Sequence, residues 1–518
     1  MDAVEVLVVG AGPTGLATAG QLATFGVRVR VVDRALDRAR ESRALAIQPR
    51  TLEVLAGIGV TDQLVAEGNR AARLCLHAQG RQRVLPLFDL GLRDTAYPFL
   101  LILSQAETER ILGERLAEGG VPVERGVELV GLDRAGDGVT ATLRHHDGGD
   151  ERLSARYVVG CDGAHSAVRR LAGIGFEGGT YPQTFVLADL EADGVDGGAT
   201  HAFLAGQGML LLFPLGRPAT WRLLAMRPPA DRTPPDAPVT LDEVQALADR
   251  YTGAALRLHD PVWMTNFRLH HRAATHYRSG PVFLAGDAVH IHSPVGAQGM
   301  NTGIQDAVNL GWKLAQALRG HADPALLDSY EAERAPVGRM VLRFTDRAFT
   351  AATSTGPLAR FVRTRVAPVL MPAVLAPRRV RATAFRTMAQ LDIGYRHSRL
   401  SAQGPGAPRT GPRAGDRLPD APVAGTTLHR LTAAPGWHLL VCGPPTAWPP
   451  DTVAPLSRAG RVTVHRLTAA DAGPALRRLG LAPDAAGLCL VRPDGHIGYR
   501  CGGGDLTGLA AYLGRWLG

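Results

Sequence analysis

The stretch Val4-Glu-Val-Leu-Val-Val-Gly-Ala-Gly-Pro-Thr-Gly15 decides the fold of this chain. Its first six residues are mostly apolar and β-branched, which predicts a buried strand. Three glycines with the spacing G-x-G-x-x-G follow, and then come a helix pattern over 16–25 and a second strand over 27–32. A strand, a glycine turn, a helix and a strand within about 30 residues predict a βαβ unit of a parallel sheet.

Each residue type in this unit suits a dinucleotide. Gly10 permits the tight turn, Gly12 lets a pyrophosphate approach the backbone, and Gly15 lets the helix pack close to the strand. The helix N-terminus offers free N–H groups and partial positive charge to phosphates. Asp33 ends the second strand, where a carboxylate can accept hydrogen bonds from a ribose. The predicted site also includes Pro13, Thr14 and Arg34.

Two later segments add to this pattern, since one fingerprint does not distinguish FAD from NAD. Residues 158–169 predict a strand, an Asp-Gly turn and a helix start, and residues 282–290 predict a strand that ends in Gly-Asp. A Pro/Gly loop over 293–301 then opens a long helix, whose N-terminus can stabilise negative charge on a flavin ring. The cofactor candidates in these segments are Asp162, Asp287, Pro294, Gly296, Gly299, Met300 and Asn301.

With these three motifs the sequence resembles the FAD-dependent aromatic hydroxylases, the single-component flavoprotein monooxygenases typified by p-hydroxybenzoate hydroxylase and phenol hydroxylase. The resemblance covers about residues 1–335. It implies that the first motif binds the ADP half of FAD and that the Gly-Asp motif binds the ribityl chain and the flavin. The Asp-Gly motif is associated in the family with both FAD and the nicotinamide cofactor. FAD is therefore the expected cofactor, with NADPH or NADH as electron donor and O2 as co-substrate.

Two further segments match the family. The segment 42–53 resembles the one whose arginine lies near the flavin and the active site, which makes Arg43 the candidate catalytic residue and a further FAD contact. The segment 104–110 resembles the helix start that holds FAD, which implies binding roles for Gln105 and Arg110.

The fold class is predicted to be α/β, with a Rossmann-like FAD-binding domain made of 1–175 and 280–400. Alternating strands and a Thr-x-x-Glu helix start over 176–279 resemble the antiparallel substrate-binding sheet inserted in this family. Period-2 spacing places Met209, Leu211 and Phe213 on one face and Trp221 on another. With His292, which follows the Gly-Asp motif, these are the candidate substrate contacts.

The tail divides into a Gly/Pro/Arg-rich linker over 401–418 and a small domain over 419–518. This domain resembles the thioredoxin-like appendage of the phenol hydroxylase and polyketide hydroxylase branch. The fragment Val441-Cys-Gly-Pro-Pro445 lacks the second cysteine that dithiol chemistry needs, so no redox role is expected.

Composition excludes several other classes. The formal charge of +9 comes from dispersed arginines without a nucleic-acid module, and the five scattered cysteines have no metal-ligand spacing. The apolar run 366–377 holds 12 residues and three prolines, which is too short to span a bilayer. We expect no nucleic acid, metal or membrane partner, a cytoplasmic location, and a monomer or homodimer. The arginine-rich stretch 360–391 leaves a membrane-surface or dimer role open.

The resemblance implies a monooxygenase that hydroxylates a polycyclic aromatic, polyketide-type substrate through a C4a-hydroperoxyflavin. Three alternatives stay open at this point. The same flavin chemistry could perform a Baeyer–Villiger insertion or inactivate an antibiotic by oxygenation, or the protein could bind flavin and substrate without turnover.

Overall fold

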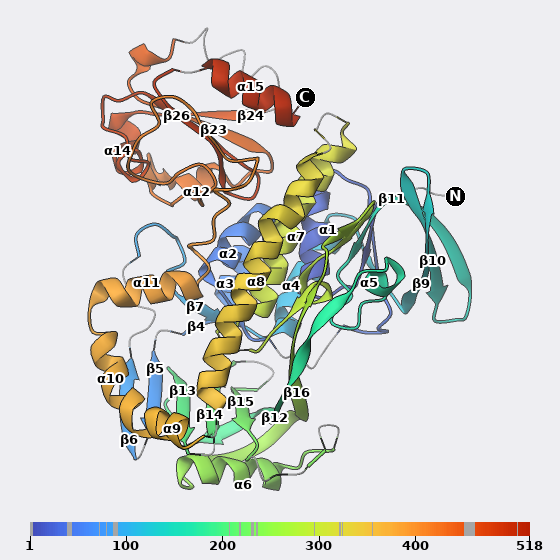
Figure 1. Ribbon diagram of the computed structural model, residues 1–518, viewed down its shortest axis with the longest axis vertical. Coiled ribbons are helices and arrows are strands. Elements are labelled where there is room, and N and C mark those ends of the chain that lie inside the picture. The colour runs from blue at the N-terminus through green and yellow to red at the C-terminus, as the bar shows by residue number, and fades with distance from the viewer. Residues whose placement is uncertain are drawn as a thin grey trace.

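The computed structural model describes residues 4–38, 44–71, 73–78, 80–85, 92–206, 208–216, 219–228, 231, 233–234, 237–294, 296–320, 323, 325–354, 356–449, 462–504 and 506–517. Three larger sheets organise these residues, as Figure 1 shows. The parallel sheet occupies the middle of the molecule, a second sheet lies at one end, and the C-terminal domain caps the other end.

The parallel sheet contains the predicted βαβ unit. Strand β1 (Val4–Val9) pairs in parallel with β2 (Val29–Asp33) and with β11 (Asp150–Gly160), and helix α1 (Pro13–Thr24) connects β1 to β2. Helix α1 packs against α4 (Gln105–Glu118) and α7 (Gly299–Leu318). The sheet is completed by β8 (Val123–Arg125), β17 (Arg278–Ser279), β18 (Val282–Leu284), and the hairpin of β9 (Val127–Ala135) and β10 (Gly138–His145).

The second sheet is largely antiparallel, as predicted. Its strands are β12 (Phe176–Asp193), β13 (Thr200–Ala205), β14 (Gly208–Pro214), β15 (Trp221–Met226) and β16 (Arg257–Ala274). Helix α6 (Leu241–Thr252), which starts with the predicted capping box at Thr240, covers one face. The long helix α8 (Ala325–Thr353) reaches the other face through Phe349. The sheet therefore has one apolar face on α6 and one turned toward the parallel-sheet domain.

One predicted domain boundary is wrong for this sheet. Strands β5 (Leu74–Ala78) and β6 (Arg81–Leu85) precede residue 176, yet β5 pairs in parallel with β13 and extends the second sheet. The physical reason is that the edge of β13 presents unpaired backbone groups, which a strand from elsewhere in the chain satisfies.

The C-terminal domain contains a parallel pair of strands followed by an antiparallel hairpin. The pair is β23 (Trp437–Cys442) and β24 (Val462–Leu467), and the hairpin is β25 (Gly487–Val491) and β26 (Ile497–Gly502). Helices α14 (Ala469–Arg478) and α15 (Leu506–Leu517) belong to the same domain. The cysteines are free and buried, and burial raises the pKa of the Cys489 thiol to about 12.

The predicted linker over 401–418 is wrong in part. Strand β20 (Ala402–Gln403) pairs with β26, and Ala414 and Leu418 are buried. Glycine and proline in this stretch shape turns that pack onto the C-terminal sheet, so the segment is part of that domain.

Shorter elements connect these parts. Further helices are α2 (Pro49–Leu55), α3 (Thr61–Glu67), α5 (Ala167–Leu171), α9 (Pro357–Phe361), α10 (Ala367–Val374), α11 (Arg378–Met388) and α12 (Leu428–Leu431). Further strands are β3 (Ala46–Ile47), β4 (Asn69–Ala71), β7 (Leu100–Ile102), β19 (His290–Ile291), β21 (Pro422–Val423) and β22 (Thr426–Thr427). Among the described helices, none has both the length and the hydropathy that crossing a membrane requires.

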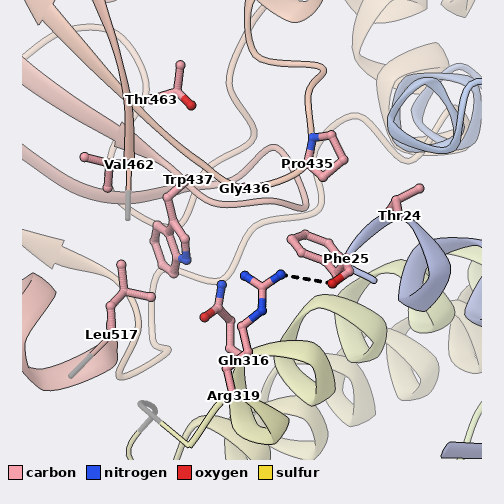
Figure 2. A pocket seen from close by; sticks show the side chains of 10 residues that line it. All are labelled: Thr24, Phe25, Gln316, Arg319, Pro435, Gly436, Trp437, Val462, Thr463 and Leu517. Carbon is pink, nitrogen blue, oxygen red and sulfur yellow. Dashed lines mark hydrogen bonds between the residues drawn. The ribbon is translucent and has the colours of Figure 1, made fainter. Parts of the chain in front are cut away.

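Aromatic packing joins the C-terminal domain to α7. The rings of Trp312 and Trp437 meet edge to face with centroids 5.5 Å apart, and both side chains are buried. Beside them the two domains leave a pocket of about 250 Å³, shown in Figure 2, into which Gln316 and Arg319 project from the end of α7. Arg319 also donates a hydrogen bond to the Phe25 carbonyl over 2.9 Å. This pocket contains none of the predicted cofactor residues.

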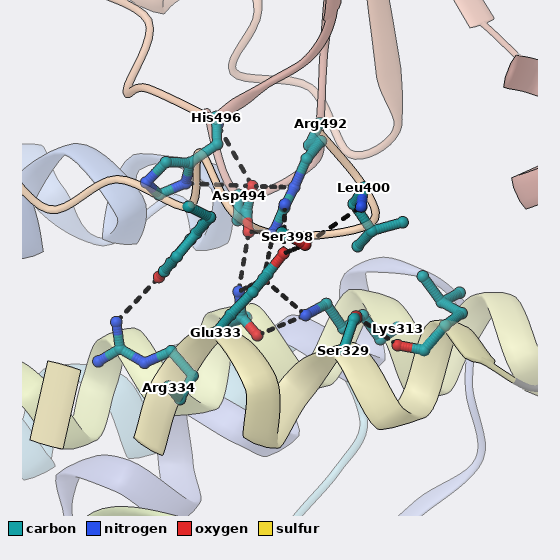
Figure 3. Close-up of polar contacts among 12 residues, drawn as sticks. Lys313, Ser329, Glu333, Arg334, Ser398, Leu400, Arg492, Asp494 and His496 are labelled. Atoms are coloured by element: carbon teal, nitrogen blue, oxygen red, sulfur yellow. Dashed lines mark hydrogen bonds and ion pairs between the residues drawn. The ribbon is translucent and has the colours of Figure 1, made fainter. Parts of the chain in front are cut away.

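A buried charge network makes the second contact between the domains (Figure 3). The Glu333 carboxylate on α8 accepts hydrogen bonds from both terminal nitrogens of Arg492, over 2.7 and 2.8 Å, and from Lys313 over 2.8 Å. Arg492 also pairs with Asp494, so one guanidinium binds two carboxylates. Burial lowers the pKa of Lys313, the single lysine of the sequence, to about 8. Removing a partner from such a network would leave buried charge without compensation.

We predict that Arg492→Met lowers the free energy of unfolding by about 3–5 kcal/mol, because Glu333 and Asp494 would lose their shared cation inside the protein. Denaturant titration followed by intrinsic tryptophan fluorescence measures the change. The matched control is Arg396→Met, which removes an exposed pair with Asp416 and is expected to cost less than about 1 kcal/mol. Equal effects of the two substitutions would contradict a structural role for the buried network.

Candidate functional site: a dinucleotide pocket beside an apolar sheet

The glycine-rich turn, the Asp-Gly segment and the Gly-Asp segment lie in close contact with one another. Gly10 has a φ of +101°, and a Cβ there would lie 2.4 Å from the Cys161 carbonyl oxygen, while one at Gly15 would lie 1.8 Å from the Gly10 oxygen. A Cβ at Gly286 or Gly303 would come within 2.5 or 2.4 Å of the Thr14 hydroxyl oxygen. These glycines are therefore required by close packing between chain segments that lie far apart in the sequence.

Gly12 differs from its neighbours because its surroundings are open. The nearest heavy atom to a Cβ there is the Glu109 Oε1, at 4.0 Å. Gly12 lines a pocket of about 220 Å³ at the N-terminus of α1, together with Asp33, Arg34 and Asp162. Space for a ligand, a glycine backbone and a helix N-terminus are what a pyrophosphate needs. The residues present thus fit FAD at this place.

Asp33 lies where the motif predicts. Its two carboxylate oxygens accept hydrogen bonds from the backbone N–H groups of Ala11 and Ala35, over 2.6 and 2.8 Å. These bonds hold the carboxylate at the end of β2, on the wall of the pocket. Arg34 is exposed at the same wall.

Asp162 also lines the pocket, but its carboxylate is used within the protein. It accepts hydrogen bonds from the Ser166 hydroxyl and from the N–H groups of Ala167 and Val168, and so it caps α5. Asp162 therefore positions the start of α5, and its direct contact with the cofactor stays a prediction. Nearby, the guanidinium of Arg169 donates to the Ala288 carbonyl over 2.9 Å, which ties the Asp-Gly segment to the Gly-Asp turn that carries the exposed Asp287.

The loop before α7 is held rigidly. Its Gly296 carbonyl accepts from the side-chain amides of Gln48 and Gln298, over 2.9 and 2.7 Å. Asn301 is fully buried, with its amide donating to the Ala46 and Ala297 carbonyls and its oxygen accepting from the Gln48 N–H. The Asn301 side chain therefore clamps the loop, and a contact between this residue and the flavin stays a prediction that concerns its backbone in the first turn of α7.

The start of α7 remains available to a ligand through its backbone. Gly299 and Met300 are its first residues, and both are half-buried, while Pro294 in the preceding loop is exposed. His292 lies beside Gly299, with its Cε1 3.6 Å from the position of a Gly299 Cβ. The Nδ1 of His292 donates to the Ser293 carbonyl over 2.9 Å. Burial and the neighbouring His290 lower the pKa of His292 to about 4, so it is neutral at physiological pH.

Two residues of α4 were predicted to hold FAD, and the structure separates them. Gln105 is near the pocket, and its side-chain amide donates to Glu109 over 2.8 Å. The Arg110 guanidinium is instead paired with three glutamates, Glu67, Glu107 and Glu114. The prediction of Arg110 as an FAD ligand is therefore wrong, since its hydrogen-bonding capacity is used on the surface between α3 and α4.

Arg43 lies outside the described residues, but the chain that follows it is fixed. The Ala44 carbonyl accepts from the Gln105 N–H over 3.1 Å and from the Arg222 guanidinium over 3.2 Å. Arg222 is itself buried and forms two 2.6 Å hydrogen bonds with the buried Asp189. This pair was missed from sequence, although a charge within each of two apolar strands, β12 and β15, is the signal that could have found it.

The predicted substrate contacts divide between the faces of the second sheet. Met209 and Leu211 belong to the apolar cluster around Phe349, on the face opposite α6, and Phe213 is half-buried two residues further along the same strand. Trp221 packs instead in the core under α6. Its prediction as a substrate contact is wrong, because strand alternation turns it to the covered face and directs Arg222 to the inner one.

Comparison with known proteins identifies the class. Residues 3–345 match the family model described as an FAD binding domain, and residues 411–518 match the aromatic-ring hydroxylase C-terminal model. The chain therefore belongs to the FAD-binding aromatic-ring hydroxylases, and it is a flavin-dependent aromatic monooxygenase. FAD is its cofactor, and membership of the family implies NAD(P)H and O2 as the other reactants.

Relatives extend this likeness over the whole chain. The 6-methylpretetramide 4-monooxygenase of Streptomyces rimosus is 39% identical, covering 98% of this chain and 93% of its own length. The structure of anhydrotetracycline hydroxylase from Streptomyces rimosus matches with a TM-score of 0.78, 31% identity and coverage of 100% and 99% of the two chains. A ternary complex of aklavinone-11 hydroxylase with FAD and aklavinone matches with a TM-score of 0.79, 28% identity and coverage of 99% of each chain.

Two glycines of the first motif, Gly10 and Gly12, offer a matched pair of variants. Gly12→Ala is expected to change the free energy of unfolding by less than about 1 kcal/mol, because its φ of −75° suits alanine and the space is open. It should still weaken FAD binding by about tenfold, because the methyl group obstructs the approach of the pyrophosphate. Gly10→Ala should cost more than about 2 kcal/mol of stability, owing to the positive φ and the contact with Cys161.

Denaturant unfolding and titration of the apoprotein with FAD, followed by flavin fluorescence, measure both effects. Unchanged FAD affinity in Gly12→Ala would contradict the placement of the pyrophosphate.

Proposed function

We propose that this enzyme hydroxylates a polycyclic aromatic substrate of the polyketide type. The observation that carries the proposal is the likeness over nearly the whole chain to 6-methylpretetramide 4-monooxygenase. The inner face of the second sheet supports it, because Met209, Leu211 and Phe349 give a planar, apolar substrate a broad surface to contact.

The proposed domains are 1–175 with 280–400 for FAD and 176–279 for substrate, with the β5–β6 hairpin added to the latter.

FAD, when bound, supplies the activation of O2 with electrons from NAD(P)H, and the chain supplies position and electrostatics. We assign the pyrophosphate to Gly12, Pro13 and Thr14 at the start of α1, and the ribose to Asp33 with Arg34 beside it. Gln105 and the backbone around Asp287 are assigned to the middle of the cofactor.

The N-terminus of α7 has the second electrostatic role in this proposal. Gly296, Gly299 and Met300 present backbone groups and the positive end of a 20-residue helix, which stabilises negative charge on a flavin ring placed there. His292 borders this position and, being neutral, adds no positive charge to that of the helix N-terminus. The clamp at Asn301 keeps the backbone groups in place without reorganisation during the reaction.

Arg43 is assigned to hold the substrate phenolate or the flavin. Arg222 supports it indirectly, because the buried Arg222–Asp189 pair fixes the carbonyl of the next residue, Ala44. A buried bidentate pair is a rigid anchor for a loop that carries a catalytic side chain.

Substrate-stimulated oxidation of NAD(P)H tests the proposal. We expect polycyclic phenols such as 6-methylpretetramide and anhydrotetracycline to accelerate NAD(P)H and O2 consumption and to yield products heavier by one oxygen atom. Label from ¹⁸O2 should appear in the product. Arg43→Ala should keep its FAD and lose at least about tenfold in stimulated turnover, because a group that holds the reacting ring contributes to positioning.

The product formed in this assay distinguishes hydroxylation from the alternative reactions. A new hydroxyl on an intact ring supports the proposal, whereas an oxygen inserted into the ring would replace it with Baeyer–Villiger chemistry. Modification restricted to finished antibiotics would indicate inactivation. FAD binding without stimulated oxidation by any polycyclic phenol would contradict the substrate class, and unchanged turnover in Arg43→Ala would contradict the role of that residue.

A further inference from the structure

A buried acid faces the place assigned to the negatively charged pyrophosphate. Glu109 lies on α4, is 5% exposed, and is the nearest group to the open side of Gly12. Its Oε1 accepts a hydrogen bond from the Gln105 amide over 2.8 Å, which fixes the carboxyl between α4 and the N-terminus of α1. A carboxylate and a pyrophosphate at one helix N-terminus would repel each other at short range.

The surroundings of Glu109 make its neutral form accessible. Burial raises its pKa to about 7, and Asp33 on β2 adds to the increase. The hydrogen bond from Gln105 and the positive charges of Arg125 on β8 and Arg38 in the loop after β2 act in the opposite direction, but they do not offset burial. The glycine-rich turn over 10–15, which faces Glu109 at the start of α1, contains no titratable side chain.

We propose that Glu109 is protonated when FAD is bound, so that binding of FAD takes up one proton at this carboxyl. A neutral carboxyl removes the like-charge repulsion and can donate a hydrogen bond to an acceptor oxygen. The inference rests on the placement of FAD proposed above, and it assigns Glu109 as a further cofactor-binding residue that makes FAD retention depend on pH.

The direction in which FAD affinity changes with pH follows from which protonation state of Glu109 binds FAD. Below the pKa of the free protein Glu109 is already neutral, so FAD affinity is at its full value. Above that pKa the free protein must gain a proton in order to bind, so the dissociation constant should rise by up to about tenfold per pH unit. The holoenzyme should therefore release FAD more readily at about pH 9 than at about pH 6.

Calorimetric titration of the full-length apoprotein with FAD at about pH 8, in two buffers of different ionisation enthalpy, measures the proton directly. The wild type should take up close to one proton, and Glu109→Gln, which is neutral at every pH, should take up none. Between about pH 6 and about pH 9 the FAD affinity of the wild type should fall, whereas that of Glu109→Gln should stay nearly constant. Glu114→Gln removes an exposed acid from the same helix and should behave as the wild type does.

The results distinguish a failure of the proposed protonation of Glu109 from a failure of the proposed FAD placement. Absence of proton uptake by the wild type would overturn the inference without any variant. A pH dependence that persists in Glu109→Gln would also overturn it, because the proton would then belong to another group. If Gly12→Ala binds FAD as tightly as the wild type, the placement of the cofactor fails instead.

Discussion

The fold depends on the close approach of three chain segments around Thr14. Gly10 touches Cys161, Gly15 touches Gly10, and Gly286 and Gly303 enclose the Thr14 hydroxyl. None of these positions has room for a Cβ, so α1 can rest against the carboxyl ends of the parallel strands and beside α7. One position, Gly12, stays open on the ligand side of the same turn. The dinucleotide pocket is therefore a direct consequence of how tightly the segments pack elsewhere.

A second constraint comes from charge buried between the domains. Arg492 of the C-terminal domain reaches Glu333 on α8, and Lys313 on α7 binds the same carboxylate. The next residue along α8, Arg334, pairs with the buried Asp306, which also accepts a hydrogen bond from His290. The C-terminal domain is thus attached to α7 and α8, which gives it a structural role that does not need dithiol chemistry.

Much of this organisation could be predicted from the sequence because it follows from local patterns. Glycine spacing located β1, α1 and β2, alternation located β15, and the capping box at Thr240 located α6. Predictions failed where the outcome depended on contacts between distant residues. The pairing of β5 with β13 and the attachment of β20 to β26 satisfy open sheet edges, and no local pattern records which segment will do so.

The candidate site likewise combines features that local patterns predict with features that depend on contacts between distant residues. Residue types placed Gly12 and Asp33 at the pocket, yet they did not reveal that Asp162 caps α5 or that Asn301 clamps a loop. A polar side chain has several possible partners, and only the three-dimensional arrangement decides whether it serves a ligand or the backbone. Glu109 was missed because it lies in a charged helical stretch, and the Arg222–Asp189 pair was missed because charged residues are usually assumed to face solvent.

We propose that the open turn at Gly12 and the start of α7 hold the two ends of one FAD molecule, and a crystal structure of the holoenzyme is the most direct test. We expect density for the pyrophosphate against Gly12, for the adenosine ribose at Asp33, and for the flavin ring between the α7 N-terminus and the inner face of the second sheet. Density for FAD in another part of the molecule, such as the interdomain pocket at Trp437, would contradict it.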